Sequence, residues 1–200
     1  LGSCPADTFS SLVKQEDSRG YTPLHYAALE GSDSMVKFLL SHGASAVAKD
    51  HQNRAPIHIA AYYGNLEVFV ALLQVDKSPL QDSDACGLKI IHLAALGNSI
   101  HAFEMVGTVD RSMFKKDDRG RSALFYATTV EFAENLVSRG FDIEEVDDNN
   151  QTILYESVLN ERFDITRWLI SKHKKNPNQS DINQISPVHL AARSGSLEIL

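Results

Sequence analysis

Two short hydrophobic stripes, each followed by a glycine, open the regular part of the chain. The first consists of Leu24, Ala27 and Ala28. The second consists of Met35, Val36, Leu39 and Leu40. Both have the spacing of one face of a helix, and Gly31 and Gly43 behind them suit the left-handed residue that ends a helix. The pattern predicts a pair of short helices, one between Pro23 and Gly31 and one ending before Gly43.

The start of the first helix is marked as well. Thr22 can accept a hydrogen bond from the free amides of a helix start, and Pro23 suits the first helical position because its missing N–H has no partner there. Asp17 and Gly20 precede them and are typical of a turn. We call such a turn, which begins at an aspartate, a finger.

The whole arrangement recurs along the chain. The most regular copy reads D-x-x-G-x-T-P-L-H-x-A-A-x-x-G and is followed by the second stripe. Copies begin at Asp17, Asp50, Asp84, Asp117, Asp147 and Asp181, and the successive differences between these numbers are 33, 34, 33, 30 and 34. Because one helix pair cannot bury its hydrophobic face alone, neighbouring copies are expected to stack.

The fixed period and the T-P-L-H-x-A signature together resemble the ankyrin repeat family, whose repeat has 33 residues. The resemblance runs from Asp17 to Leu200. It implies an all-α fold, an ankyrin-repeat solenoid of helix-turn-helix units with projecting β-turn or hairpin fingers. We expect one continuous domain of copies at residues 17–49, 50–83, 84–116, 117–146, 147–180 and, truncated, 181–200. Residues 1–16 are expected to be the tail of an upstream repeat with an inserted loop, and further repeats are expected in the same chain.

The third to fifth copies depart from the signature. The fourth is about three residues short in its first helix and has Phe125 in the histidine position. It reads Ala127-Thr128-Thr129 where the closely packed alanines belong. We therefore expect the stacking interfaces of this copy to be the weakest.

Eight histidines raise the question of a metal site, because imidazole ligates zinc near neutral pH. Four of them occupy the same motif position about one repeat apart, and no H-E-x-x-H segment occurs. The resemblance implies that these four make hydrogen bonds that tie neighbouring turns together. With Thr22 and Pro23 they form the expected structural motif: His25, His58, His92 and His189. The other four are expected at the surface: His42, His51, His101 and His173.

Composition and charge narrow the function classes. The chain is 43% hydrophobic and 22% charged, which is typical of a soluble, core-forming protein. With 19 basic and 26 acidic residues the net charge is −7, so the positive field that attracts nucleic acid is missing.

No stretch approaches the ~20 apolar residues of a membrane span, so no membrane insertion by this segment is expected. Cys4 and Cys86 suggest neither a disulfide framework nor a zinc site. We expect a reducing, cytoplasmic location, with the nucleus as the alternative.

Catalytic signatures do not occur in the sequence. It contains no G-x-S-x-G, G-x-x-x-x-G-K-S/T or G-x-G-x-x-G segment. Carboxylate pairs lie in predicted fingers, where solvent keeps them ionised and unsuited to general acid catalysis: Asp117-Asp118, Glu144-Glu145 and Asp147-Asp148. The basic run at residues 172–175 follows a predicted helix end, where cations complement the helix dipole. A phosphate or lipid-headgroup contact is its alternative role. We expect no enzyme activity and no cofactor.

Some positions of each copy are not dictated by folding. They are the two after the finger Asp, the one before T-P-L-H and the two between Ala-Ala and Gly, and the resemblance implies that they face the concave side. Tyrosine and arginine are common in interface hot spots. The candidate partner-binding residues are Arg19, Tyr21, Leu29, His51, Arg54, Tyr62, Tyr63, Leu88 and Leu96. The alternative for Tyr62 and Tyr63 is packing on each other and on the neighbouring helix.

Charge adds a second surface feature. A basic stretch precedes the fourth copy: Arg111, Lys115 and Lys116. An acidic stretch leads into the fifth: Asp142, Glu144, Glu145, Asp147 and Asp148. Neighbouring fingers of opposite sign are expected to attract each other, or to match the charges of a partner.

The sequence thus predicts a protein-interaction module that binds another protein or peptide through its concave groove and fingers. The alternative keeps the fold but makes this segment the regulatory or substrate-recruiting arm of a larger protein. An ion channel, an acyltransferase or a ubiquitin ligase would then carry its activity outside these residues.

Overall fold

The computed structural model describes residues 10–109 and 114–195. The chain falls into two compact units, Leu1–Phe114 and Lys115–Leu200, so the division lies directly before the fourth copy. Regular structure in the described residues is helical, with isolated antiparallel bridges Ser83–Lys89 and Val146–Thr152 and no strand. The predicted all-α fold is confirmed. None of the described helices is long and apolar enough to cross a membrane.

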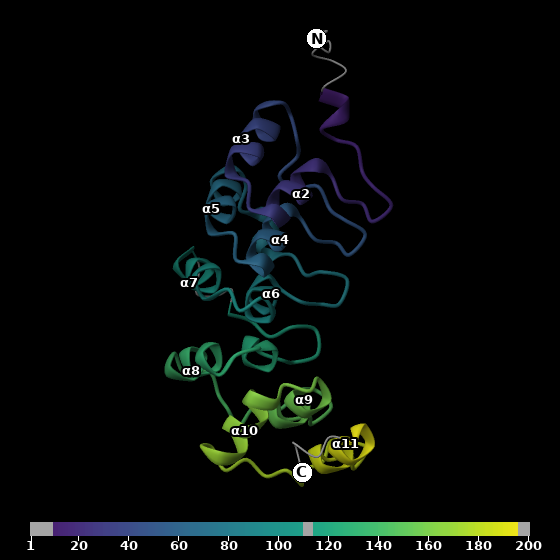
Figure 1. The fold of residues 1–200 in the computed structure, drawn as a ribbon, viewed down its shortest axis with the longest axis vertical. Coiled ribbons are helices and arrows are strands. Elements are labelled where there is room, and N and C mark those ends of the chain that lie inside the picture. The colour runs from purple at the N-terminus through teal and green to yellow at the C-terminus, as the bar shows by residue number, and fades with distance from the viewer. Residues whose placement is uncertain (1–9, 110–113, 196–200) are drawn as a thin grey trace. The chain divides into compact units, whose positions relative to one another are not determined.

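Unit 1 is built from helix pairs that pack side by side (Figure 1). Its inner helices are α2 (Pro23–Glu30), α4 (Pro56–Tyr63) and α6 (Ile90–Leu96). Its outer helices are α3 (Asp33–Ser41), α5 (Leu66–Val75) and α7 (Ile100–Val109), and a 3-10 turn, η1 (Ser78–Gln81), follows α5. Each inner helix packs on the next inner helix, and each outer helix on the next outer helix. The fingers project on the side of the inner helices away from the outer ones (Figure 1).

Unit 2 repeats the arrangement with one defect. Its elements are η3 (Ala123–Tyr126), α8 (Val130–Ser138), α9 (Ile153–Leu159), α10 (Phe163–Ser171) and α11 (Pro187–Ser194). The first helix of the fourth copy is reduced to the 3-10 turn η3, as its shortened sequence predicts. Helix α9 packs on η3 and on α11, and α10 packs on α8 and α9.

The local signals of the sequence act as expected in the regular copies. Thr22 is extended, with φ −84° and ψ 165°, and Pro23 begins α2. Gly31 ends α2 in the left-handed region at φ 73°, where a side chain would be strained. The inner helices approach each other through fully buried alanines: Ala28, Ala61 and Ala95.

Neighbouring copies are also joined through the residue just before each outer helix. Asn65 Nδ2 donates to the main-chain carbonyls of Ala28 and Leu29, at 2.8 and 2.9 Å. Ser99 Oγ donates to the carbonyl of Tyr62 at 3.3 Å. In unit 2, Arg162 Nη1 donates to the carbonyl of Phe125 at 2.6 Å. We call these bonds inter-repeat caps, because they satisfy carbonyls that the end of a helix leaves free.

Candidate functional site

The finger aspartates shape the fingers. Asp50 Oδ1 accepts the main-chain N–H groups of Gln52 and Arg54, at 2.9 and 2.8 Å. The aspartate that begins each of the other copies accepts the equivalent pair of N–H groups. Asp117 and Asp147 are consequently buried rather than solvated as the sequence predicts. Their Oδ1 atoms hold the turn by accepting main-chain N–H groups.

His25 joins two copies. Its Nδ1 accepts the N–H of Thr22 at 3.1 Å, and its Nε2 lies 3.0 Å from the carbonyl oxygen of Arg54 in the next finger. Burial lowers the pKa of His25, so the ring stays neutral and its Nε2–H donates to that carbonyl. This is the bond between neighbouring turns that the resemblance implies.

The remaining motif histidines divide into two kinds. His58 and His92 are fully buried, and their Nδ1 atoms accept the N–H groups of Ala55 and Lys89, at 3.1 and 3.0 Å. His189 caps its own helix in the same way, but it is exposed, because no described helix covers that face of α11. Of the four histidines expected at the surface, His173 is half-buried against Trp168, with ring centroids 4.4 Å apart.

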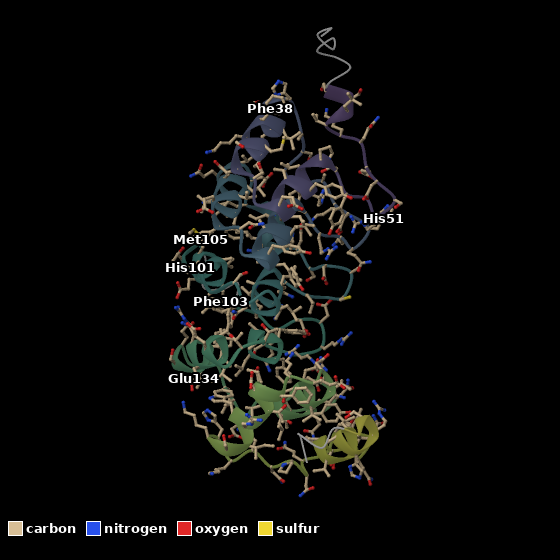
Figure 2. The ribbon with its side chains drawn as sticks, viewed as in Figure 1. Phe38, His51, His101, Phe103, Met105 and Glu134 are labelled. Atoms are coloured by element: carbon tan, nitrogen blue, oxygen red, sulfur yellow. The ribbon has the colours of Figure 1, made fainter. Side chains whose placement is uncertain are left out.

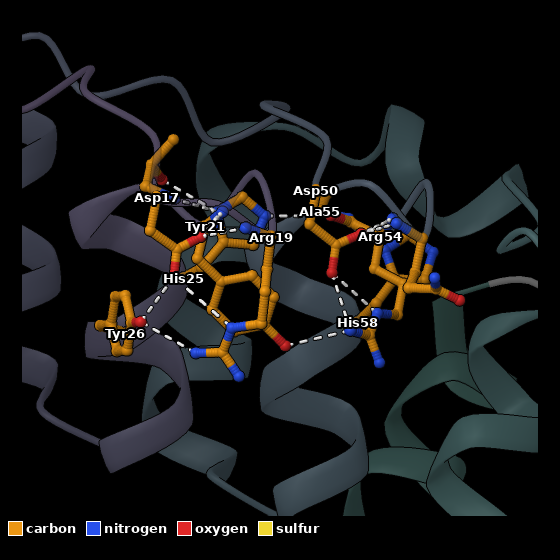
Figure 3. A network of polar contacts seen from close by, with 11 residues as sticks. Asp17, Arg19, Tyr21, His25, Tyr26, Asp50, Arg54, Ala55 and His58 are labelled. Atoms are coloured by element: carbon orange, nitrogen blue, oxygen red, sulfur yellow. Dashed lines mark hydrogen bonds and ion pairs between the residues drawn. The ribbon is translucent and has the colours of Figure 1, made fainter.

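Tyr21 is not the exposed binding residue that the sequence predicts. Its side chain is buried and stacks on His25, with ring centroids 5.2 Å apart. Its hydroxyl accepts a 3.0 Å hydrogen bond from Arg54, whose guanidinium also binds Asp50 (Figure 3). The Arg19 guanidinium lies 4.6 Å from the centre of the same ring. Tyr21 therefore positions the two arginines and offers little surface to a partner.

Tyr26 is a surface residue that is not among the predicted site residues. Its hydroxyl donates to Asp17 at 2.7 Å and accepts from Arg19 at 2.8 Å (Figure 3). The bond from the Tyr26 hydroxyl lowers the pKa of Asp17 to about 2. A signal was available, because the equivalent residues of the next two copies, Ile59 and Leu93, are apolar. An apolar position in successive copies indicates a face that packs against another element.

Tyr62 and Tyr63, which we call the tyrosine pair, end α4. Their rings meet edge to face with centroids 5.0 Å apart, yet the side chains remain 39% and 53% exposed. The tyrosines thus pack on each other, as the alternative predicts, without being covered. Their backbone is fixed from the next copy, since Ser99 binds the carbonyl of Tyr62.

The other predicted partner-binding residues also lie in unit 1. Arg19 and His51 are exposed. Four are half-buried: Leu29, Arg54, Leu88 and Leu96. Adjacent fingers are bonded in sequence, because the N–H of His51 donates to the carbonyl of Arg19 at 2.9 Å and the N–H of Ala85 to that of Gln52 at 2.8 Å. His51 lies on the finger side, opposite Phe38, His101 and Met105 on the outer helices (Figure 2).

Opposite charges in neighbouring fingers do pair. Lys116 Nζ lies 3.2 Å from Glu145 Oε2, and Lys49 forms the equivalent pair with Asp82 in unit 1. Arg111 lies outside the described residues. Glu144 pairs with Lys175. Both glutamates therefore form ion pairs between copies, and a partner would have to compete with these pairs.

The basic run at residues 172–175 is partly neutralised. Lys172 pairs with Glu134, and Lys175 with Glu144. These pairs weaken the case for a phosphate or headgroup contact.

A buried ion cluster joins the fourth and fifth copies, which have Phe125 and Tyr155 in the histidine position. Arg121 is 4% exposed, and its guanidinium lies 2.8 Å from Asp147 Oδ2 and 3.0 Å from Glu156 Oε1. The Tyr126 hydroxyl donates to Asp117 beside it. Burial and this bond raise the pKa of Tyr126. The cluster was not predicted, although the arginine before the S-A-L-F segment occupies the same motif position as Arg54.

A metal site does not assemble in the part of the chain that the structure describes. There, no three or more His, Cys, Asp or Glu side chains converge so that they could hold a metal ion. Cys86 is an exposed free cysteine. The exposed aromatic rings and the paired charges of the described residues are suited to contact with another molecule.

Comparisons with known proteins agree with this geometry. A family model described as "Ankyrin repeats (3 copies)" matches residues 4–81, 57–147 and 128–200. The solved ankyrin repeat domain of Bcl-3 superposes with a TM-score of 0.64 at 18% identity, covering 92% of this chain and 85% of that one. At that identity the likeness concerns the fold.

Two human proteins are similar in sequence. Transient receptor potential cation channel subfamily A member 1 is 32% identical over 127 residues, which are 62% of this chain and 11% of that protein. Rabankyrin-5 is 27% identical over 184 residues, which are 91% of this chain and 13% of that protein. The chain therefore spans only a small part of the length of these relatives.

Proposed function

Because the chain belongs to the ankyrin repeat family, we propose that it is a non-catalytic module that binds another protein through the inner helices and fingers of its first three copies. The observation that carries the proposal is the tyrosine pair. Both rings are exposed although Ser99 of the next copy binds the carbonyl of Tyr62, and exposed aromatic side chains that a scaffold does not need are typical of interaction sites.

The residues around the tyrosine pair refine the proposed surface. Arg19 and His51 present exposed polar groups on adjacent, mutually bonded fingers. Leu29 and Leu96 occupy the position of Tyr62 in the inner helices on either side, and equivalent positions of packed helices lie about 10 Å apart. The proposed surface thus has an aromatic and apolar centre with a polar rim, which is the usual anatomy of a protein interface. The buried Tyr21 contacts Arg19 and Arg54 and holds them in this surface.

The experiment is a binding isotherm for the double variant Tyr62→Ala and Tyr63→Ala, with a partner first obtained by affinity capture. We expect binding to weaken by ~2 kcal/mol, roughly thirtyfold in Kd, as hot-spot truncations do. The unfolding midpoint should change little. Phe38→Ala is the matched control, since Phe38 is 45% exposed on the outer helix α3. If the tyrosine variant binds normally but unfolds readily, the pair serves packing and the proposed surface is wrong.

A second function has a specific observation in its favour, the similarity to a cation channel. In that case the module would be a regulatory arm inside the cell, attached to a membrane protein. The flanking sequence of the longer polypeptide distinguishes the two proposals, because a channel arm must be followed or preceded by membrane-spanning helices of ~20 apolar residues. A cytoplasmic location fits both proposals.

A further inference from the structure

Three serine or threonine residues of the chain stand directly before a proline, which is the order that proline-directed protein kinases recognise. The dipeptides are Thr22-Pro23, Ser78-Pro79 and Ser186-Pro187. A dipeptide alone does not make a modification site, because a kinase must also reach the hydroxyl. The structure separates the three by their surroundings.

Thr22 and Ser186 are closed to a kinase. They are 5% and 2% exposed. Each hydroxyl lies against the ring nitrogen Nδ1 of the histidine three residues later, at 2.9 and 2.8 Å. The prolines that follow them begin α2 and α11. Helix capping therefore accounts for both dipeptides.

Ser78 has different surroundings. It is exposed and lies between α5 and the third finger, where it is the first residue of the 3-10 turn η1. The residue three positions later is Gln81 rather than a motif histidine. The cap that the repeat motif uses thus gives no reason for a serine and a proline at this place.

The hydroxyl of Ser78 belongs to a small hydrogen-bonded turn with Asp76. The N–H of Ser78 donates to Asp76 Oδ1 at 2.8 Å. This bond and one from the Ser78 hydroxyl lower the pKa of Asp76, so the carboxylate is ionised at neutral pH. Asp76 also ends α5, because its own N–H donates to the carbonyl of Leu72. The two residues therefore set the direction in which the chain leaves α5 and enters η1.

The turn η1 connects the second copy to the third. Pro79 and Leu80 are buried, and η1 packs on α4. Directly after it, Asp82 pairs with Lys49, which stands just before the second finger. Two main-chain hydrogen bonds of 3.1 Å close the turn, from Leu80 to Lys77 and from Asp82 to Pro79. Because a single 3-10 turn has poor hydrogen-bond geometry, η1 opens at lower cost than the helices around it.

We infer that Ser78 is a phosphorylation site for a proline-directed protein kinase, and that its phosphate holds η1 in an opened form. In the transfer, Ser78 Oγ forms a bond to the γ-phosphorus of ATP, and the bond from that phosphorus to the oxygen that stays with ADP breaks. The hydroxyl proton passes to the catalytic aspartate of the kinase. The kinase takes up the opened turn, because Pro79 must leave its buried position to be recognised. The inference stands even if the proposed binding surface is wrong.

The phosphate opposes reclosure of η1 through its charge. It carries about −1.5 to −2 at neutral pH and would lie next to the ionised carboxylate of Asp76, which it repels. The Ser78 oxygen also loses the proton that it donates to Asp76. Lys77 is exposed, and a pair between its ammonium group and the phosphate draws the serine away from Asp76. All these effects favour the open turn.

The first experiment incubates the folded chain with magnesium ATP and a proline-directed kinase, one of the mitogen-activated and one of the cyclin-dependent class, and locates phosphate by peptide mass spectrometry. We expect Ser78 to be modified roughly tenfold faster than Thr22 or Ser186, because those two are buried. Pro79→Ala is the matched control, since it keeps the serine and should abolish the reaction. Ser18, exposed but followed by arginine, should stay unmodified. A folded chain without phosphate at Ser78, or with equal phosphate at all three dipeptides, would overturn the inference.

Amide exchange of the phosphorylated and the unmodified chain tests the opened form. The amides of Leu80 and Asp82 close η1, so they should exchange roughly tenfold faster with the phosphate in place. Asp76→Asn is the matched variant, because its side-chain oxygen still accepts the N–H of Ser78 but carries no charge. In this variant the phosphate should accelerate exchange much less. Equal exchange with and without phosphate would refute the opened form, and full acceleration in Asp76→Asn would refute repulsion by Asp76 as its cause.

Discussion

Arg162 and Phe125 are joined across two copies of unit 2, where Nη1 of the arginine donates to the main-chain carbonyl of the phenylalanine at 2.6 Å. The same nitrogen lies 3.2 Å from the carbonyl of Ala127. Phe125 stands where the regular copies have histidine, and its segment forms only the 3-10 turn η3. The long arginine side chain thus satisfies carbonyls that a full helix turn would satisfy internally.

Replacing Arg162 with alanine should therefore destabilise unit 2. The two buried carbonyls would lose their donor, which costs about 1–3 kcal/mol. Arg162→Lys should restore little, because an ammonium group cannot reproduce the geometry of a guanidinium. The measurement is urea unfolding followed by fluorescence of Trp168, the one tryptophan of the chain, which is buried in α10. Arg167→Ala, at an exposed position of the same helix, is the control, and equal midpoints for the two alanine variants would refute the role of Arg162.

The regular copies were predictable because their signals are local. Thr22, Pro23 and Gly31 set the ends of one helix through their own backbone preferences, and the repeat of 33 residues multiplies that pattern. The fourth copy was predictable for the same reason, since its missing residues lie within the motif. Periodicity therefore gave the fold, the helix pairs and the place of the defect.

The site was less predictable because long polar side chains form hydrogen bonds with residues about thirty positions away in the sequence. Tyr21 is buried because Arg54 of the next finger and His25 of its own copy enclose it. Arg162 and Arg121 act across copies in the same way. The motif predicts where the backbone of a residue lies. Whether its side chain is exposed or hydrogen-bonded depends on the residues of the neighbouring copy.

Acid should weaken unit 1 through His58. Burial lowers the pKa of His58 from 6.5 to about 4, so the unfolded chain binds a proton in the range where the folded chain does not. The contribution of neutral His58 to the free energy of unfolding is therefore complete above about pH 6.5. It falls as the pH drops toward 4, by at most ~1.4 kcal/mol per pH unit. Thermal unfolding followed by circular dichroism at pH 7, 6 and 5 measures this. His58→Gln should flatten the dependence, whereas His101→Gln at an exposed position should not, and parallel curves for wild type and His58→Gln would exclude His58 as the source.

Gly97 should tolerate no side chain, although its own conformation is ordinary. Its φ of −81° suits any residue, but a Cβ atom added there would lie 1.6 Å from the carbonyl oxygen of Tyr62. Because that carbonyl also accepts the inter-repeat cap of Ser99, neither α4 nor α6 can yield without breaking their contact. We expect Gly97→Ala to cost about 3 kcal/mol, at the upper end for overpacked sites, and to shift the tyrosine pair that ends α4. The measurements are thermal unfolding and amide exchange at Ser99.

Gly140→Ala is the control, since an added Cβ there meets no atom within 4 Å and only the backbone at φ 91° is strained, which costs about 1 kcal/mol. A Gly97→Ala protein as stable as the control would mean that the inner helices separate more easily than their packing indicates, and the rigid support of the tyrosine pair would have to be abandoned.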